Sequence, residues 1–154
     1  MLNRVESYLY RYAIRSEYPV VLLCVQGMDA EGEADYDKAH QLFKQAWDMA
    51  NNDFEASTAA HYLARNQKDP NDKLKWNLEA LNLAHRVEHD GVQGYYPSLY
   101  LNVAKSYEDL GDRINAIHYY EQAAESCEHL PDTGYADMIR SGVDSGLKRV
   151  ALNS

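Results

Sequence analysis

The sequence predicts an all-α protein built from about three helix hairpins, with one helix before them and a capping helix after them. Strand signals are nearly absent, because only the run Val20 to Val25 has the density of β-branched residues typical of a buried strand. Capping residues mark helix boundaries, as where Gly111 is followed by Asp112. Between such marks, apolar residues recur at helical spacing. These observations together favour a fully helical fold.

The chain is expected to begin with an N-terminal helix over residues 1–16 and a first hairpin over residues 17–51. Charges are scattered through residues 1–16, so a secretory signal peptide is not expected. The run Val20 to Val25 is interpreted as helix and is far too short to cross a membrane. Asp35 is expected to precede the second helix of the hairpin. That helix presents one apolar stripe: Ala39, Phe43 and Ala46.

A second hairpin is expected over residues 53–89. Its second helix is expected to start at Asp69, which provides an N-cap. Pro70 follows at the first helical position, where the missing N–H costs no hydrogen bond. The interval from Asp35 to Asp69 is 34 residues, whereas the interval from Asp69 to Asp112 is 43 residues. The second hairpin therefore has long helices or an extended connection to the third.

The third hairpin is expected over residues 93–130 and carries the clearest pattern. Gly111 can take the left-handed conformation that ends one helix, and Asp112 can cap the next helix. Small residues let the two helices approach, while aromatic rings fill the remaining gaps. The pattern consists of Tyr100, Val103, Ala104, Tyr107, Ala116, Tyr120 and Ala123. Residues 133–151 complete the prediction as a capping helix with apolar residues at helical spacing.

This pattern of small and aromatic residues resembles the tetratricopeptide repeat (TPR). The segments AHYLARNQ, WNLEAL and YYPSLYLN are similar to small stand-alone bacterial TPR proteins, over roughly residues 35–149. A chain of 154 residues suits a single domain over residues 1–154. The resemblance implies that it is built from about three TPR-like hairpins stacked as a short right-handed solenoid. The resemblance implies no agreed activity. From the predicted fold we expect a protein or peptide interaction module, a scaffold or adaptor that binds its partner in a concave groove.

Composition limits the partners to be expected. Lysine and arginine number 15 against 24 aspartates and glutamates, which gives a formal net charge of -9. Such a charge repels a phosphate backbone at long range, so nucleic acid is not an expected partner. Cys24 and Cys127 match no metal or redox spacing and are expected to be buried free thiols. We expect a cytoplasmic protein without membrane association, and the sequence leaves open whether it forms a homo-oligomer.

Motifs for catalysis are weak. His85, Glu88 and His89 form the string H-x-x-E-H, the helical zinc-binding signature of one class of metalloprotease. A protease of that class also needs a third ligand and a substrate cleft, for which a small helical array has little room. The string is therefore interpreted as a polar helix end. Scattered acids earlier in the chain are interpreted as a solvated loop: Glu31, Glu33 and Asp35.

The sequence therefore predicts no enzyme, no catalytic residue, no cofactor and no metal site. Two alternatives remain. One is a metal-binding or hydrolytic protein that uses the helix carrying His85, Glu88 and His89. The other is a self-associating structural subunit whose groove is filled by its own termini or by a second copy.

A partner groove is predicted on the first helices of the second and third hairpins. Arg65 and Lys105 supply positive charge within an acidic chain, and Asn66 and Asn102 can bond a peptide backbone through both donor and acceptor. These residue types favour a ligand with an acidic group or a free C-terminal carboxylate. The full set is Thr58, Tyr62, Arg65, Asn66, Ser98, Leu101, Asn102, Lys105 and Glu108.

Overall fold

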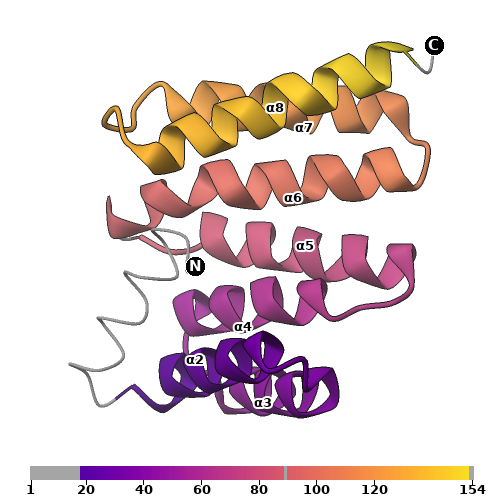
Figure 1. Ribbon diagram of the computed structural model, residues 1–154. Helices are drawn as coiled ribbons and strands as arrows, with labels where there is room; N and C mark the ends of the chain where they lie inside the picture. The colour runs from indigo at the N-terminus through magenta and orange to yellow at the C-terminus, as the bar shows by residue number, and fades with distance from the viewer. Residues whose placement is uncertain (1–17, 89, 153–154) are drawn as a thin grey trace. The chain divides into compact units, whose positions relative to one another are not determined.

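A computed structural model describes residues 18–88 and 90–152 of the chain (Figure 1). Within these ranges the chain forms seven α-helices and one short 3-10 helix, and it contains no strand. The predicted all-α class is therefore confirmed. None of the helices described is both long and apolar enough to cross a bilayer. The N-terminal helix predicted over residues 1–16 lies outside the described residues.

The helices form two compact units. The first unit contains α2 (Pro19–Gly32), α3 (Tyr36–Met49), α4 (Asp53–Arg65) and α5 (Pro70–His85). The second unit contains η1 (Asp90–Tyr95), α6 (Tyr96–Asp109), α7 (Arg113–Cys127) and α8 (Gly134–Leu152). The helices pack as the pairs α2 with α3, α4 with α5, and α6 with α7, while α8 packs against α6 and α7 (Figure 1). Each range predicted as a hairpin thus contains two packed helices, and a single domain over residues 1–154 stays a prediction.

Short-range hydrogen bonds explain where the helices begin. The side chain of Asp35 accepts a hydrogen bond from the backbone N–H of Lys38 at 3.2 Å, and Asp69 and Asp112 cap α5 and α7 in the same way. Asn52 caps α4 by accepting from the N–H of Glu55 at 2.9 Å. The sequence interpretation had identified the three aspartates and had missed Asn52. Each cap satisfies a backbone donor that the first helical turn leaves without an intrahelical partner.

In the first unit, a large ring fills the space left by small residues. Phe43 is fully buried, and its ring stacks on Tyr62 of α4 with centroids 5.3 Å apart. On the other side, a Cβ added to Gly27 would lie 2.2 Å from the Phe43 ring. Helix α2 therefore approaches α3 over a residue without a side chain, and Phe43 connects α2, α3 and α4.

In the second unit, Tyr120 takes the corresponding place. It is fully buried on α7, between Ala116 and Ala123, which are also fully buried. A Cβ added to Gly146 of α8 would lie 2.2 Å from the Tyr120 ring. Ala104 of α6 belongs to the same buried cluster. Small residues therefore let α6, α7 and α8 close around one tyrosine.

Other tyrosines of the second unit form a row of ring contacts. Tyr107 stacks on Tyr119 with centroids 5.5 Å apart, and Tyr119 in turn contacts Tyr100 at 6.4 Å. Tyr96 stacks on Tyr100 at 6.1 Å. Partial burial raises the pKa of Tyr96, Tyr100 and Tyr107, so their phenols stay protonated at neutral pH. This row accounts for part of the excess of tyrosine over phenylalanine.

The turn before α3 and the turn before α7 share one backbone geometry. Each contains one residue with positive φ, but the residue type differs between the two turns. Gly111 has φ of 77°, and Ala34 has φ of 60° at the corresponding place before α3. In both turns the next residue, Asp112 or Asp35, donates its N–H at 2.9 Å to a carbonyl five residues back. A left-handed conformation costs an L-residue about 1 to 2 kcal/mol relative to glycine's freedom. The first unit therefore carries backbone strain that the second unit avoids.

We expect Ala34→Gly to raise the free energy of unfolding by about 0.5 to 1 kcal/mol, because relief of the strain exceeds the added entropy of the unfolded chain. The reverse change, Gly111→Ala, should lower it by about 1 kcal/mol, since a Cβ there meets no neighbouring atom and only the backbone is strained. Urea unfolding of both variants measures the two effects. If Ala34→Gly instead lowered the free energy of unfolding, the inference that Ala34 is strained would be wrong.

Candidate functional site

The residues of the predicted partner groove fall in both units. Thr58, Tyr62, Arg65 and Asn66 belong to α4 and its C-cap, in the first unit. Ser98, Leu101, Asn102, Lys105 and Glu108 belong to α6, in the second unit. Each set is therefore considered within its own unit.

Two residues of the first set lie inside the unit. The exposed fractions of Thr58 and Tyr62 are 6% and 1%. The Thr58 hydroxyl donates to the carbonyl of Phe54 at 2.9 Å, and the Tyr62 ring packs on Phe43. Helix α4 is contacted by α2, α3 and α5, so little of its surface is left for a partner. The prediction that Thr58 and Tyr62 line an exposed groove is therefore wrong.

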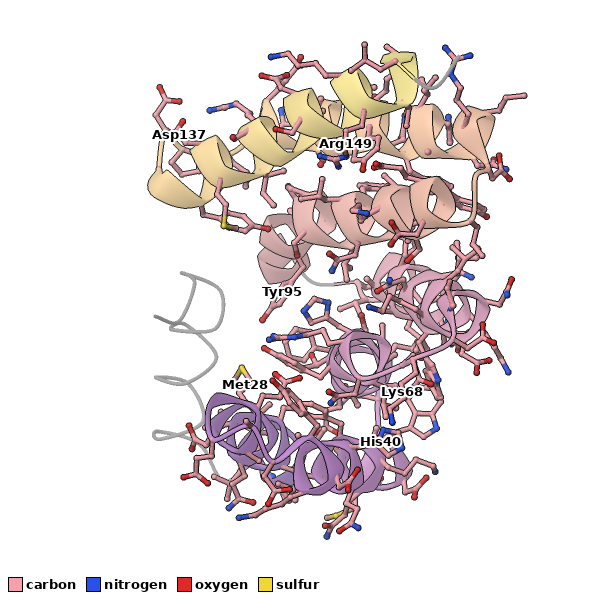
Figure 2. The ribbon with its side chains drawn as sticks, turned by 45° about the vertical axis from the view of Figure 1, so that its right-hand side comes forward. Met28, His40, Lys68, Tyr95, Asp137 and Arg149 are labelled. Atoms are coloured by element: carbon pink, nitrogen blue, oxygen red, sulfur yellow. The ribbon has the colours of Figure 1, made fainter. Side chains whose placement is uncertain are left out.

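The other two residues of the first set, Arg65 and Asn66, line a hollow of about 720 Å³ in the first unit. Its walls come from the end of α2, the turn into α3, and the residues that follow α4. One of the residues that follow α4 is Lys68, which is labelled in Figure 2. The lining residues are Glu31, Ala34, Asp35, Tyr36, Asp37, Arg65, Asn66, Gln67 and Lys68. Three carboxylates and two cationic side chains therefore surround this space.

Hydrogen-bond donors gather on the α4 side of the hollow. The Nη2 atom of Arg65 lies 3.0 Å from Oε2 of Glu31, and the guanidinium carbon lies 5.6 Å from the centroid of the Tyr62 ring. The Arg65 side chain is 40% exposed and that of Glu31 is 13% exposed. The buried Nδ2 of Asn66 has no hydrogen-bond partner among the described residues. A buried donor without an acceptor is costly, and it is a group that a bound ligand can satisfy.

Ser98 and Leu101 of the second set are held by contacts within their own unit. The Ser98 hydroxyl donates to the carbonyl of Tyr95 at 3.3 Å. Leu101 packs against the buried cluster, and a Cβ on Gly142 of α8 would meet it at 3.1 Å. Asn102 is partly buried. The structure thus gives Leu101 a packing role against α8, where the sequence predicts a groove position.

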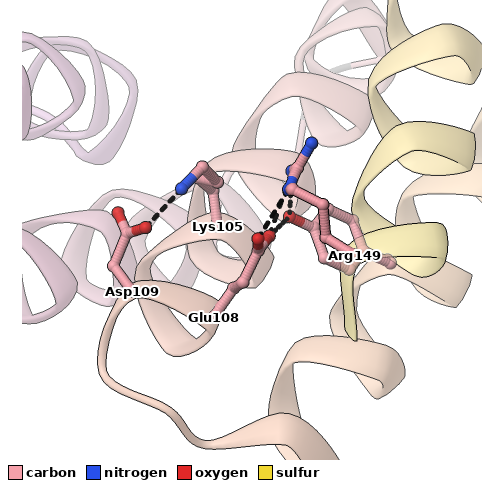
Figure 3. A network of polar contacts seen from close by, with 5 residues as sticks. Lys105, Glu108, Asp109 and Arg149 are labelled. Atoms are coloured by element: carbon pink, nitrogen blue, oxygen red, sulfur yellow. Dashed lines mark hydrogen bonds and ion pairs between the residues drawn. The ribbon is translucent and has the colours of Figure 1, made fainter. Parts of the chain in front are cut away.

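The two charged residues of the second set are already paired. Lys105 forms an ion pair with Asp109, one turn along α6, and Glu108 binds Arg149 of α8 (Figure 3). Nε and Nη2 of Arg149 donate to the two Glu108 oxygens at 2.6 and 3.1 Å, and the Tyr120 hydroxyl donates to Glu108 as well. The Arg149 hydrogen bonds lower the pKa of Glu108, against partial burial, which raises it. Burial and the neighbouring Glu108 raise the pKa of the Tyr120 phenol, which keeps its proton.

The H-x-x-E-H string does not form one helical zinc motif. Helix α5 ends at His85 with Arg86 as its C-cap, so Glu88 lies beyond the helix. His89 is outside the described residues. In the two described stretches, no group of three or more His, Cys, Asp or Glu side chains is placed to hold a metal ion. The metal-binding alternative requires His85 and Glu88 on one helix. Because Glu88 lies beyond the end of α5, this requirement is not met.

Sequence reasoning missed Glu31 and Lys68 as residues of the hollow. Glu33 and Asp35 are exposed as expected of a solvated loop, whereas Glu31 is largely covered and paired with Arg65. The repeated sequence pattern contained a signal that Glu31 is covered and paired. Glu31 stands four residues before its N-cap Asp35, as Glu108 stands four residues before Asp112.

Cys24 and Cys127 are buried free thiols, as predicted. Burial raises the pKa of Cys24 to about 12, so this thiol stays neutral. Comparison with known proteins adds no relative, because no protein-family model and no curated protein matches this sequence. The candidate site of this chain is therefore defined by its own geometry, the hollow beside Arg65 and Asn66.

Proposed function

We propose that this chain is a TPR-like helical repeat protein, a short right-handed solenoid that acts as a protein or peptide interaction module. Three features shared by the two units support the proposal. Both units have a large buried ring against a glycine, and both have a left-handed residue before an N-cap aspartate. Both also pair a glutamate at the end of one helix with an arginine on a later helix, Glu31 with Arg65 and Glu108 with Arg149.

The observation that carries a binding function is the hollow of the first unit, where Arg65, Lys68 and the Nδ2 atom of Asn66 come together. A guanidinium, an ammonium and an amide N–H are the donors that recognise a carboxylate. We therefore propose a peptide with an acidic side chain or a free C-terminal carboxylate as the ligand. The two buried free thiols fit a reducing compartment such as the cytoplasm.

Binding can be tested by NMR titration of the labelled protein at low salt, where charge interactions are least screened. We expect pentaglutamate to shift the amide signals of Arg65, Asn66 and Lys68, and pentalysine amide, which carries no carboxylate, to leave them in place. Two further probes distinguish the source of the carboxylate. Pentaglutamate amide carries only side-chain carboxylates, and pentaglycine carries only the terminal one.

A pair of variants checks the location. Arg65→Ala should weaken pentaglutamate binding by about tenfold, since it removes a charge-assisted contact. Lys105→Ala is the matched control, because Lys105 pairs with Asp109 on α6 and lies outside the hollow, and we expect no change. Shifts confined to α6, or no response to any carboxylate probe, would contradict the proposed site.

A further inference from the structure

We propose that the hollow of the first unit recognises a basic side chain as well as a carboxylate, so that its ligand is a peptide carrying both groups close together. This inference rests on the proposed function and deepens it, because it names the side chain that the ligand places beside its carboxylate. The observations that carry it lie at the start of α3, in a part of the lining that does not include Arg65 or Asn66.

The charges in the lining of the hollow do not balance. Glu31 pairs with Arg65 at 3.0 Å, so these two charges largely compensate each other. Of the other lining residues, Asp35 and Asp37 are acidic and Lys68 is basic. A carboxylate that enters alone adds a further negative charge to this set, whereas a ligand that also carries a cation offsets it. The charge of the lining therefore favours a ligand with both charges.

An exposed aromatic ring lies between the two aspartates. Tyr36 is the first residue of α3, lines the hollow and is 62% exposed. Most of its surface is open to solvent, so packing in the core does not account for an aromatic residue at this place. The face of a tyrosine ring attracts a lysine ammonium or an arginine guanidinium. Tyr36 is therefore suited to contact a basic side chain of the ligand.

The carboxylates on either side of this ring complete the surroundings of a cation. Asp37 follows Tyr36 in the first turn of α3 and is exposed. Asp35 precedes it and is also exposed, and its cap on α3 uses one carboxylate oxygen, Oδ1. Two negative charges outweigh the partial positive charge of a helix start, about half an elementary charge. Lysine and arginine are the side chains that supply the matching charge at neutral pH.

The carboxylate of the same ligand has donors on another segment of the lining. The buried Nδ2 atom of Asn66 has no hydrogen-bond partner within the described part of the chain, and Lys68 is exposed. Both residues follow α4, so the two ligand groups are bound by different segments. The volume of about 720 Å³ falls within the range of ligand pockets, roughly 300 to 1,000 Å³.

Two kinds of peptide present this pair of groups. One ends in lysine or arginine, whose own terminal carboxylate lies next to the basic side chain. The other carries an acidic residue beside a basic one within the chain. The chemistry that the hollow recognises is the same in both, and the experiment distinguishes them.

The test is an NMR titration of the full chain at low salt with acetylated peptides, in which no N-terminal ammonium is present. Acetyl-diglycyl-lysine should bind about fivefold more tightly than acetyl-diglycyl-norleucine, which has the same unbranched chain without the charge. Only the lysine peptide should shift the amide signal of Asp37. The C-terminal amide of the lysine peptide should bind more weakly than the acid, because it lacks the carboxylate. Acetyl-glycyl-glutamyl-lysyl-glycine amide provides the internal pair of groups.

Variants locate the site of the basic side chain. The double variant Tyr36→Leu with Asp37→Asn should lose the preference for lysine over norleucine, because the ring and one carboxylate are removed together. Asp72→Asn is the matched control: Asp72 is an acidic residue in the first turn of α5 and lies outside the hollow. This control should keep the preference within about twofold of the wild type, as expected for a distant exposed charge.

The outcomes separate this inference from the proposed function. Equal binding of the lysine and norleucine acids to the wild type overturns the inference and leaves the carboxylate site standing. A preference that persists in the double variant, or that Asp72→Asn also removes, overturns it as well. A lysine amide that binds as tightly as the lysine acid overturns the joint recognition of two groups. If neither these peptides nor pentaglutamate bind, the inference and the proposed function are both wrong. Circular dichroism melting of each variant confirms that the fold is intact.

Discussion

Replacing Gly146 with alanine is expected to lower the free energy of unfolding by about 2 to 3 kcal/mol, because the added methyl overpacks a filled core. The new Cβ would stand 2.2 Å from Cζ and 2.6 Å from the hydroxyl oxygen of Tyr120. That ring cannot easily turn away. It is fully buried, and its hydroxyl is bonded to Glu108.

Helix propensity predicts the opposite result, so the experiment distinguishes the two effects. Alanine is favoured over glycine in a helix interior by about 1 kcal/mol. Gly142, one turn earlier on α8, is the matched control. A Cβ there would meet only the flexible side chain of Leu101, with Cδ2 at 3.1 Å and Cδ1 at 3.4 Å. Gly142→Ala should therefore be neutral or stabilising. A stabilised Gly146→Ala variant in urea unfolding would show that Tyr120 is not held as the structure describes.

Arg149→Met is expected to lower the free energy of unfolding at pH 7 by about 1 to 2 kcal/mol, a range that allows for solvent screening of the exposed guanidinium. The Arg149 side chain is 45% exposed, whereas that of Glu108 is 12% exposed. The variant leaves a covered carboxylate without its cationic partner. Lys105→Met is the control, because both members of its ion pair are about half exposed. We expect the control to change stability by less than about 0.5 kcal/mol.

The same variant should change how stability depends on pH. Arg149 lowers the pKa of Glu108 in the folded chain below its ordinary value of 4.5. The contribution of this pair is therefore complete above pH 4.5 and is lost as the pH falls through the folded pKa. The difference in stability between wild type and Arg149→Met should accordingly narrow at acid pH. A difference that is constant from pH 7 to pH 3 would contradict the assigned role of Glu108.

Local features of the fold could be predicted from sequence because their causes are local. Asp35, Asp69 and Asp112 each bond a backbone N–H two or three residues ahead, so a short stretch contains the whole interaction. Spacing of small and large residues placed Ala116, Tyr120 and Ala123 on one buried face, where the structure has them.

The candidate site was predicted only in part. Arg65 and Asn66 were identified by residue type, and both line the hollow. Thr58 and Tyr62 were assigned to the same surface by helical spacing. Spacing defines which residues share a face of α4, but it does not say that neighbours on several sides cover the helix. The difference between a groove residue and a core residue therefore depended on packing.

The sequence by itself determined the all-α class, the helix caps and the pattern of small and aromatic residues where paired helices pack. These features follow from the spacing of residues a few positions apart. Only the tertiary structure decided the use of the charged side chains. The Glu31–Arg65 and Glu108–Arg149 pairs join residues on different helices, and they turn two apparently exposed acids into covered ones. The choice of partner for a long flexible side chain depends on distances between helices, which periodicity along the chain does not contain.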